Sequence, residues 1–293
     1  MEKHINKAKT LIEAIPYIQS FRGKTVVVKY GGSAMVDERI KELMTKDIAL
    51  LKLLGIEIVL VHGGGPFINE NLKKLNKQAE FKEGLRVTDE ETMEIVEMVL
   101  SGKINKEIVN DIQKNGVQSV GISGKDGMTL KAKKLLVNGL DIGFVGEIES
   151  VDTKLIDCLL GCGFIPVVAP IGRDDEGNTY NVNADYAAVS IAEALNAQKL
   201  VFITDVKGVM KDVNNPESLI TQMNVKEARE NIENGIISGG MIPKVECCIE
   251  AVERGVETVH IIDGRVEHSM LLEIFTQEGI GTMFKKNGDV KND

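Results

Sequence analysis

Two glycine clusters, each following a β-branched apolar run, are the residues of this sequence most suited to chemistry. Lys29-Tyr-Gly-Gly-Ser33 follows the run 25–28, and His62-Gly-Gly-Gly-Pro66 follows the run 56–61. The runs predict buried parallel strands, so both clusters should lie at strand carboxyl ends, where open α/β sheets bind ligands. Glycines leave backbone N–H groups bare for an anion, and Lys29 adds a positive charge. The pattern predicts phosphate chemistry, although two plain strand-to-helix turns would explain either cluster alone.

Two later motifs supply a carboxylate and a second lysine. In Asn181-Val-Asn-Ala-Asp185, Asn183 is placed to cap the following helix, and a carboxylate in its first turn favours the helix dipole. The alternative is functional: Asn181 donates to a substrate oxygen, and Asp185 is held between two lysines and orients them. The second lysine is Lys244, at the end of a glycine loop that opens a helix with Pro243 near its first position.

Two further residues each allow a functional and a structural interpretation. Asp205, in Thr204-Asp-Val-Lys-Gly-Val209, follows an apolar run and is available to a ribose or to magnesium, or it belongs to a solvated turn. Arg86 is expected on a loop, where it would clamp a carboxylate or form a surface ion pair. Two common nucleotide motifs fail, since Ser119 and Asp126 break the phosphate-loop pattern and Phe67 and Ile68 break the dinucleotide pattern.

Composition restricts the class of partner. The 293 residues include 44 acidic and 35 basic side chains, and the net charge of −9 argues against nucleic acid as the main partner. No apolar stretch approaches the length of a membrane span, and the amino terminus lacks the apolar core of a signal peptide, so we expect a cytoplasmic protein. The four cysteines, at 158, 162, 247 and 248, lack zinc-site spacing and are expected to be reduced core thiols.

The positioning elements alternate between strand and helix. A kinked amphipathic helix, interrupted by Pro16, should precede them and pack on its own domain or on another subunit. We expect strands at 25–30, 56–61, 118–122, 164–169, 200–204, 257–262 and 281–284. Helices are expected at 37–54, 66–77, 155–161, 185–196, 225–234, 244–254 and 267–276, and 88–113 is either one long helix or two helices divided near Gly102. Short strands at 130–149 should form β-hairpins over the main sheet. This order predicts a doubly wound α/β fold, with helices on both faces of a mainly parallel open sheet.

Six motifs in one order resemble the amino-acid kinase family. They are Lys-Tyr-Gly-Gly-Ser, Val-His-Gly-Gly-Gly-Pro, Gly-Leu-Arg-Val-Thr, Asn-Val-Asn-Ala-Asp, Thr-Asp-Val-Lys-Gly-Val and Gly-Gly-Met-Ile-Pro-Lys. The third and fourth are more specific to the branch that uses ATP, with Mg2+, to phosphorylate the γ-carboxylate of N-acetyl-L-glutamate in arginine biosynthesis. The resemblance implies a carbamate kinase-like three-layer αβα sandwich, with an oligomerisation helix at 1–22, an acyl-amino-acid-binding lobe at 23–198 and a nucleotide-binding lobe at 199–293.

The same resemblance assigns roles residue by residue. Lys29 and Lys244 would stabilise the transition state, and Asp185 would organise them. The acyl-amino acid would be held by Gly64, Gly65, Arg86 and Asn181. ATP would contact segments 205–210 and 236–241, with Gly31, Gly32, Asp205, Gly208, Gly239, Gly240 and Met241 as the nucleotide-binding residues.

The two ends of the chain resemble those of the arginine-inhibited members. In these, an extra amino-terminal helix interlaces dimers into a hexamer, a trimer of dimers, and Tyr17 would lie on it. His268, Glu273, Glu278 and Gly279 resemble their arginine site, and an ordinary closing helix and strand is the alternative. Other open alternatives are acetylaminoadipate as substrate and a non-catalytic arginine-sensing subunit; the sequence does not decide whether a PII-type regulator binds, as in some members.

Overall fold

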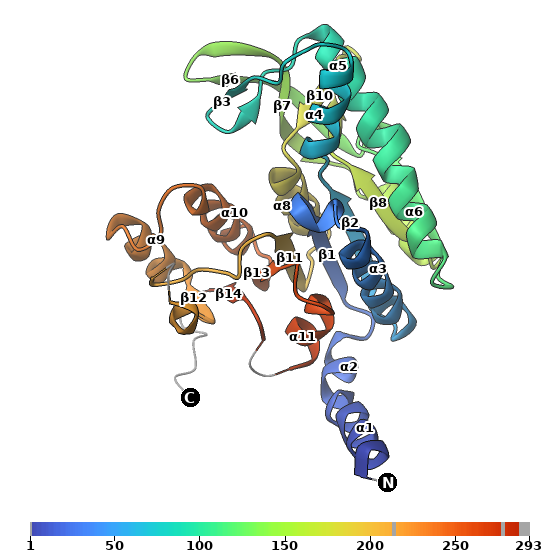
Figure 1. Ribbon diagram of the computed structural model, residues 1–293. Helices are drawn as coiled ribbons and strands as arrows, with labels where there is room; N and C mark the ends of the chain where they lie inside the picture. Colours follow the sequence, from blue (N-terminus) through green and yellow to red (C-terminus); the bar gives the residue numbers. More distant parts are fainter. Residues whose placement is uncertain (1, 213–214, 277–278, 287–293) are drawn as a thin grey trace.

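An eight-stranded sheet with the order β12-β14-β13-β11-β1-β2-β8-β5 forms the centre of the computed structural model (Figure 1). The structure describes residues 2–212, 215–276 and 279–286. All neighbouring strands are parallel except β13 and β14. The strands are β1 (Thr25–Tyr30), β2 (Glu57–His62), β5 (Ser119–Ser123), β8 (Ile165–Ala169), β11 (Lys199–Thr204), β12 (Gln222–Asn224), β13 (Thr258–Asp263) and β14 (Thr282–Lys285).

Helices cover both faces of this sheet, as the alternation predicted. Side chains of successive strand residues point to opposite faces, so Val27 belongs to one core cluster while Val26 and Val28 belong to the other. The first cluster is covered by α7 (Lys154–Gly161), α8 (Ala184–Ala194), α9 (Val225–Glu233) and α10 (Met241–Glu253). The second is covered by α3 (Glu38–Leu53), α4 (Gly65–Lys74), α5 (Glu90–Glu97), α6 (Asn105–Gln113) and α11 (Ser269–Phe275). The three-layer αβα prediction is confirmed.

Local signals set several of the helix starts. The Asp37 carboxylate accepts hydrogen bonds from the N–H groups of Arg39 and Ile40, so α3 begins after the predicted cap. The Asn183 side chain caps α8 through the N–H of Asp185 at 2.8 Å. Helix α10 begins at Met241, which makes Pro243 its third residue rather than its first. Short 3-10 segments lie at η1 (Gly32–Met35), η3 (Asp126–Met128) and η4 (Pro216–Ser218).

Two small sheets lie beyond the ends of the main strands (Figure 1). The predicted hairpin is present as β6 (Leu130–Val137) and β7 (Leu140–Val151), but with β9 (Ile171–Arg173) and β10 (Thr179–Val182) it closes into a small sheet of its own instead of lying over the main one. The second small sheet pairs β3 (Phe81–Lys82) with β4 (Leu85–Arg86). The loop prediction for Arg86 was therefore wrong, because this residue is paired with Phe81 in a short hairpin.

The long helix predicted at 88–113 continues through its middle in an unusual form. Between α5 and α6 lies a π-helix, η2 (Met98–Ile104), which contains Gly102. The glycine marks a wider turn instead of a break. Such π segments are rare and concentrate at functional sites, so its position relative to the ligand cavities matters.

The amino-terminal segment forms α1 (Glu2–Glu13) and α2 (Ile15–Phe21), with Pro16 in the first turn of the second helix. The two helices project from the body of the molecule, and the side chains of Ile5, Leu11, Ile12 and Ile15 are exposed. In the described part of the chain, no helix combines the length and apolar character that crossing a membrane requires.

The prediction that the cysteines are core thiols is correct for only one of the two pairs. Cys247 and Cys248 are buried thiols on α10, but Cys158 and Cys162 are exposed. Cys158 lies on α7 and Cys162 is the C-cap residue of that helix, whose core contacts are made by Ile156 and by the partly buried Leu155, Leu159 and Leu160. All four are free.

Candidate active site

An ion pair between β1 and α8 lies at the carboxyl edge of the sheet. Lys29 Nζ is 2.8 Å from Asp185 Oδ1, and both side chains are largely buried. The register places Lys29 beside Val61 of β2 and Phe202 of β11, which makes it the central residue of this edge. A Cβ on Gly31 would lie 2.6 Å from Lys29 Nζ, so glycine leaves room for the ammonium group.

The second lysine acts on the same carboxylate. Burial raises the pKa of Asp185, but the ammonium groups of Lys29 and Lys244 outweigh this effect, so its pKa lies below the ordinary value. Lys244 lies on α10, which packs against α8. The structure therefore brings together three residues that are far apart in the sequence, and Asp185 remains ionised between two cations.

A cavity of about 180 Å³ lies beside this cluster, on the β2 and β10 side. Gly64, Gly65, Arg86 and Asn181 all line it, together with apolar side chains that include Leu100. Asn181 Nδ2 lies 3.2 Å from Thr88 Oγ1, and Thr88 in turn donates to the carbonyl of Arg86. The four residues expected to hold an acyl-amino acid therefore share one cavity.

Arg86 is buried in this cavity with few partners. Its guanidinium donates one long hydrogen bond, 3.3 Å, to Gly65 O and stacks 4.7 Å from the Phe81 ring centroid. Its Nη1 is buried without a hydrogen-bond partner among the described residues. Burial lowers the pKa of Arg86, yet a guanidinium stays charged in proteins. Such an orphaned donor fits a ligand carboxylate.

A second cavity, of about 380 Å³, lies beyond the end of β11, on the opposite side of β1 from β2 and the first cavity. Lys29, Asp185 and Lys244 are not among the described residues that line either cavity. Residues 205–210 after β11, residues 236–238 and Met241 line it, which brings the two segments expected to contact ATP face to face. Asp205, Gly208 and Met241 are thus lining residues. Gly31, Gly32, Gly239 and Gly240 are not among the described residues that line either cavity; they lie in the turns after β1 and before α10.

Arg265 also lines the larger cavity, although the segment 260–265 resembles part of the arginine site and was not expected to lie beside the nucleotide. It follows β13, whose Asp263 pairs with Thr204 of β11, so the register brings residue 265 to segment 205–210. Asp263 holds the guanidinium through Nε and Nη2 at 2.9 and 2.8 Å. The only sequence feature that indicated this place was the position of Arg265 two residues after the apolar strand β13.

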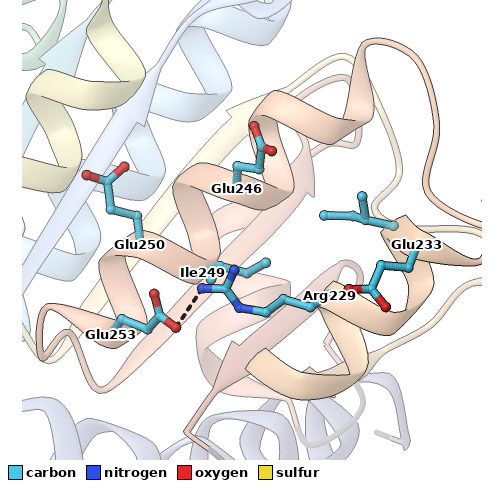
Figure 2. Close-up of a pocket in the computed structure, with 7 residues that line it drawn as sticks. Arg229, Glu233, Glu246, Ile249, Glu250 and Glu253 are labelled. Carbon is cyan, nitrogen blue, oxygen red and sulfur yellow. Dashed lines mark hydrogen bonds and ion pairs between the residues drawn. The ribbon is translucent and has the colours of Figure 1, made fainter.

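A third cavity, of about 240 Å³, lies between α9 and α10 and has the opposite electrostatic character (Figure 2). Glu233, Glu246, Glu250 and Glu253 line it together with the guanidinium of Arg229, which pairs with Glu253 at 2.7 Å, while Glu250 pairs with Arg254. Four carboxylates in its lining disfavour an anionic ligand. This cavity therefore suits a phosphate group less well than the two cavities on either side of β1.

The residues expected at an arginine site lie near α11 but do not form one cluster. Glu273 is buried and accepts from His260 Nδ1 at 2.5 Å and from the N–H of Ile280 at 2.8 Å. Gly279 is adjacent to Glu273, whereas His268 bonds Asp47 at 2.6 Å. Tyr17 lies on α2, which packs against α11, and Glu278 lies outside the described residues.

Known proteins resemble this chain over nearly its whole length. A model of the amino acid kinase family matches residues 24–263. The chain belongs to this family, and it is a kinase.

The most similar relatives include the acetylglutamate kinases of Thermoanaerobacter pseudethanolicus, 57% identical over 282 residues (96% of this chain and 94% of the relative), and of Methanocaldococcus jannaschii, 52% identical over 296 residues (98% and 99%).

Solved structures have the same fold. N-acetylglutamate synthase from Neisseria gonorrhoeae, complexed with coenzyme A and N-acetyl-glutamate, is 28% identical with a TM-score of 0.86; the match covers 97% of this chain but 64% of the synthase. Carbamate kinase from Giardia lamblia bound to AMP-PNP is 17% identical with a TM-score of 0.64, covering 90% of this chain and 99% of that one, and shows the fold alone.

Proposed function

We propose that this kinase transfers the γ-phosphoryl group of ATP to the γ-carboxylate of N-acetyl-L-glutamate, giving N-acetylglutamyl 5-phosphate and ADP in arginine biosynthesis. The observation that carries the proposal is the Lys29–Asp185 pair between two cavities, one lined by Arg86 and Asn181 and the other by segments 205–210 and 236–238. Acetylglutamate kinases that are more than 50% identical across the chain support the choice of acceptor.

The residues suit a carboxylate acceptor. A carboxyl group with a pKa of about 4.3 is ionised at neutral pH, so the attacking oxygen needs no general base. The barrier is repulsion between two anions, and the protein's task is positioning and cationic stabilisation. In the proposed complex, Arg86 and Asn181 hold the acceptor. The N–H groups of Gly64 and Gly65 donate to the carboxylate that receives the phosphoryl group, and Lys29 and Lys244 stabilise that phosphoryl group during transfer.

Asp185 has a positioning role in this scheme. Its carboxylate stays ionised and holds Lys29 at 2.8 Å, so that ammonium group keeps one direction as negative charge develops. Because Asp185 is itself anchored at the capped start of α8, the pair has little freedom.

We propose Mg2+ as the accompanying metal. Mg2+ is usually bound through one or two carboxylates together with substrate phosphates and water, so its site would form with the nucleotide. Asp205, on the rim of the larger cavity, is the carboxylate best placed to approach it. When bound, the ion neutralises phosphate charge.

We also propose the division of the chain into an acceptor lobe at 23–198 and a nucleotide lobe at 199–293. Among the described residues, those that line the acceptor cavity fall within 63–184, and those that line the larger cavity fall within 205–265. Lys29 and Lys244 come from different lobes, and both lower the pKa of Asp185.

An ADP-release assay tests the reaction directly. We expect turnover with N-acetyl-L-glutamate and little turnover with glutamate. Acetylaminoadipate should react more slowly than N-acetyl-L-glutamate, since its extra methylene changes the transition-state free energy by about 1–3 kcal/mol. No ADP release with N-acetyl-L-glutamate would contradict the proposed function.

We further propose feedback inhibition by L-arginine and a hexameric assembly. The packing of α2 on α11, next to Glu273 and Gly279, supports an effector site, and the exposed side chains of Ile5, Leu11, Ile12 and Ile15 support pairing with a second copy. Millimolar arginine should lower the rate, and a chain lacking residues 1–22 should have the mass of a dimer by light scattering. Kinetics insensitive to arginine, or an unchanged mass, would contradict the respective proposal.

A further inference from the structure

The buried amide of Asn105 joins three strands behind the acceptor cavity. Asn105 is fully buried and is the first residue after the π-helix η2. Its Nδ2 lies 3.2 Å from His62 Nε2 on β2, 3.3 Å from Ile122 O on β5 and 2.9 Å from Val167 O on β8. Its Oδ1 accepts from Lys106 Nζ at 2.9 Å, which fixes the orientation of the amide.

The hydrogen bonds assign the proton of His62. Its Nδ1 lies 2.8 Å from Gly63 O, and a carbonyl oxygen only accepts, so Nδ1 carries the proton. Nε2 is then the acceptor for Asn105 Nδ2. Burial lowers the pKa of His62 to about 4; the hydrogen bond to the Gly63 carbonyl opposes this shift, and the Lys106 cation, the smallest of the three effects, adds to it. The imidazole is therefore neutral at neutral pH, with one tautomer.

This chain of hydrogen bonds ends on the peptide that joins Gly63 to Gly64. The C=O and N–H of a trans peptide point in opposite directions. Because His62 holds the Gly63 carbonyl on the buried side, the Gly64 N–H points away from the imidazole, and Gly64 lines the acceptor cavity. One neutral histidine thus sets the direction of an N–H donor in that cavity.

The π-helix holds the other side of the same turn. A Cβ on Gly64 would lie 2.4 Å from Leu100 Cδ2 and 2.6 Å from Ile104 Cδ1, so these side chains are in contact with the glycine. Gly121 makes room in a similar way, since a Cβ there would lie 1.8 Å from Asn105 Oδ1. The wider turn of η2 therefore delivers both an apolar wall and the Asn105 amide to the glycine loop.

We propose that Asn105 and His62 are positioning residues for the acceptor substrate, and that η2 exists to place them. They fix the Gly63–Gly64 peptide so that the Gly64 N–H donates to the carboxylate that receives the phosphoryl group. This inference rests on the proposed function, and the experiment below separates the two.

Asn105→Ala removes the donor to His62, and Asn115→Ala is a matched control. Asn115 follows the same helix and donates to Asp111 O at 2.9 Å and Thr45 Oγ1 at 3.3 Å, away from both cavities. Each variant is measured by ADP release for kcat and for KM of both substrates, and by calorimetry for the Kd of ATP. We expect kcat/KM for N-acetyl-L-glutamate to fall at least tenfold in Asn105→Ala, with the Kd of ATP within twofold, and neither to change in the control.

Asn105→Asp allows a measurement whose result would not change if Asn105 had only a structural role. It keeps the shape of the side chain but replaces Nδ2 with a carboxylate oxygen, which lies beside His62 Nε2 and also faces the carbonyls of Ile122 and Val167. Lys106 is the charged group that acts on this ring in the wild type, and it opposes the effect of the new anion. The ring should then take up a second proton near neutral pH, seen as a titrating His62 signal in NMR spectra of a chain with four histidines. An acid limb, absent from the wild type, should appear in kcat/KM for the acceptor.

The outcomes are distinct. A wild-type protein that does not phosphorylate N-acetyl-L-glutamate overturns the proposed function. An active wild type, with both Asn105 variants within twofold of its acceptor kcat/KM and with the same pH profile, overturns the positioning role. Loss of ATP binding in Asn105→Ala and Asn105→Asp together would show a general structural role and would overturn it as well.

Discussion

Arg86→Met should weaken acceptor binding strongly while leaving the folded protein about as stable as before. The guanidinium is buried, and in the described residues its Nη1 has no partner. An unsatisfied buried donor costs about 1–3 kcal/mol, and methionine removes it while keeping much of the side-chain volume. What is lost is one long hydrogen bond to Gly65 O and a stacking contact with a half-exposed Phe81, together about 1–2 kcal/mol.

For stability, the gain from removing the unsatisfied donor nearly cancels the loss of the hydrogen bond and the stacking contact. For substrate binding, no such gain offsets the loss. The free energy of unfolding should change by no more than about 1 kcal/mol in either direction. Loss of a buried charge-assisted pair with a substrate carboxylate should cost about 2–4 kcal/mol, which is roughly a 30- to 1,000-fold rise in the KM of N-acetyl-L-glutamate. The KM of ATP should not change, because Arg86 does not line the larger cavity.

The assay is urea unfolding together with ADP-release kinetics, with Arg229→Met as the control. Arg229 forms an exposed pair with Glu253 in the acid-lined cavity, so its loss should cost less than about 1 kcal/mol and leave both KM values unchanged. An acceptor KM within threefold of the wild type in Arg86→Met would refute the carboxylate clamp. A stability loss above about 3 kcal/mol would show that the arginine is structural.

Three further predictions concern other parts of the site and its supports. Lys29→Ala and Lys244→Ala should each lower kcat more than tenfold with the fold retained by circular dichroism, and unchanged rates in both would remove their assignment. Gly64→Ala should destabilise the fold by about 1–2 kcal/mol, because the new methyl meets Leu100 and Ile104; in a double-mutant cycle with Leu100→Ala, the absence of coupling would refute the contact. A hydrogen bond from Lys77, with others from the start of α5, lowers the pKa of Asp89 to about 2. Its stabilisation is therefore fully present above the unfolded-state pKa of about 4 and is lost as the pH falls through and below about 2. The difference between the urea midpoints of the wild type and of Asp89→Asn, which keeps the cap, should shrink steadily from about pH 4 to about pH 2, and a difference that stays constant over this range would contradict this account.

The sequence was sufficient for elements whose signals are local. Unbroken β-branched runs predict buried parallel strands, and the Asp37 and Asn183 caps mark helix starts within a residue. Because parallel strands end at one edge, the proximity of the two glycine clusters, which follow the neighbouring strands β1 and β2, could be predicted from the fold class. The pairing of Lys29 with Asp185 could not, since Asn181 lies on β10, outside the main sheet.

Features that depend on contacts distant in the sequence were not predictable in the same way. The π-helix reflects packing of Leu100 and Ile104 on a glycine forty residues earlier, and the sequence shows only Gly102. The short β3–β4 hairpin has no apolar run and is held by Arg86 stacking on Phe81. Arg265 reaches the larger cavity through strand register, which a linear sequence does not display.

The strand order reverses at β1, with β2 on one side and β11 on the other. In the proposed complex, the residues that bind the acceptor are thus encoded before residue 185 and those that bind ATP after residue 204, with Lys29 on the strand between the two cavities. Such an arrangement allows the acceptor specificity to change through substitutions in the first part of the sequence, provided that Lys29 is kept, because the ATP-binding part need not change. Chimaeras between paralogues joined in the stretch 186–198 would inherit the acceptor preference of the parent that supplies the first half.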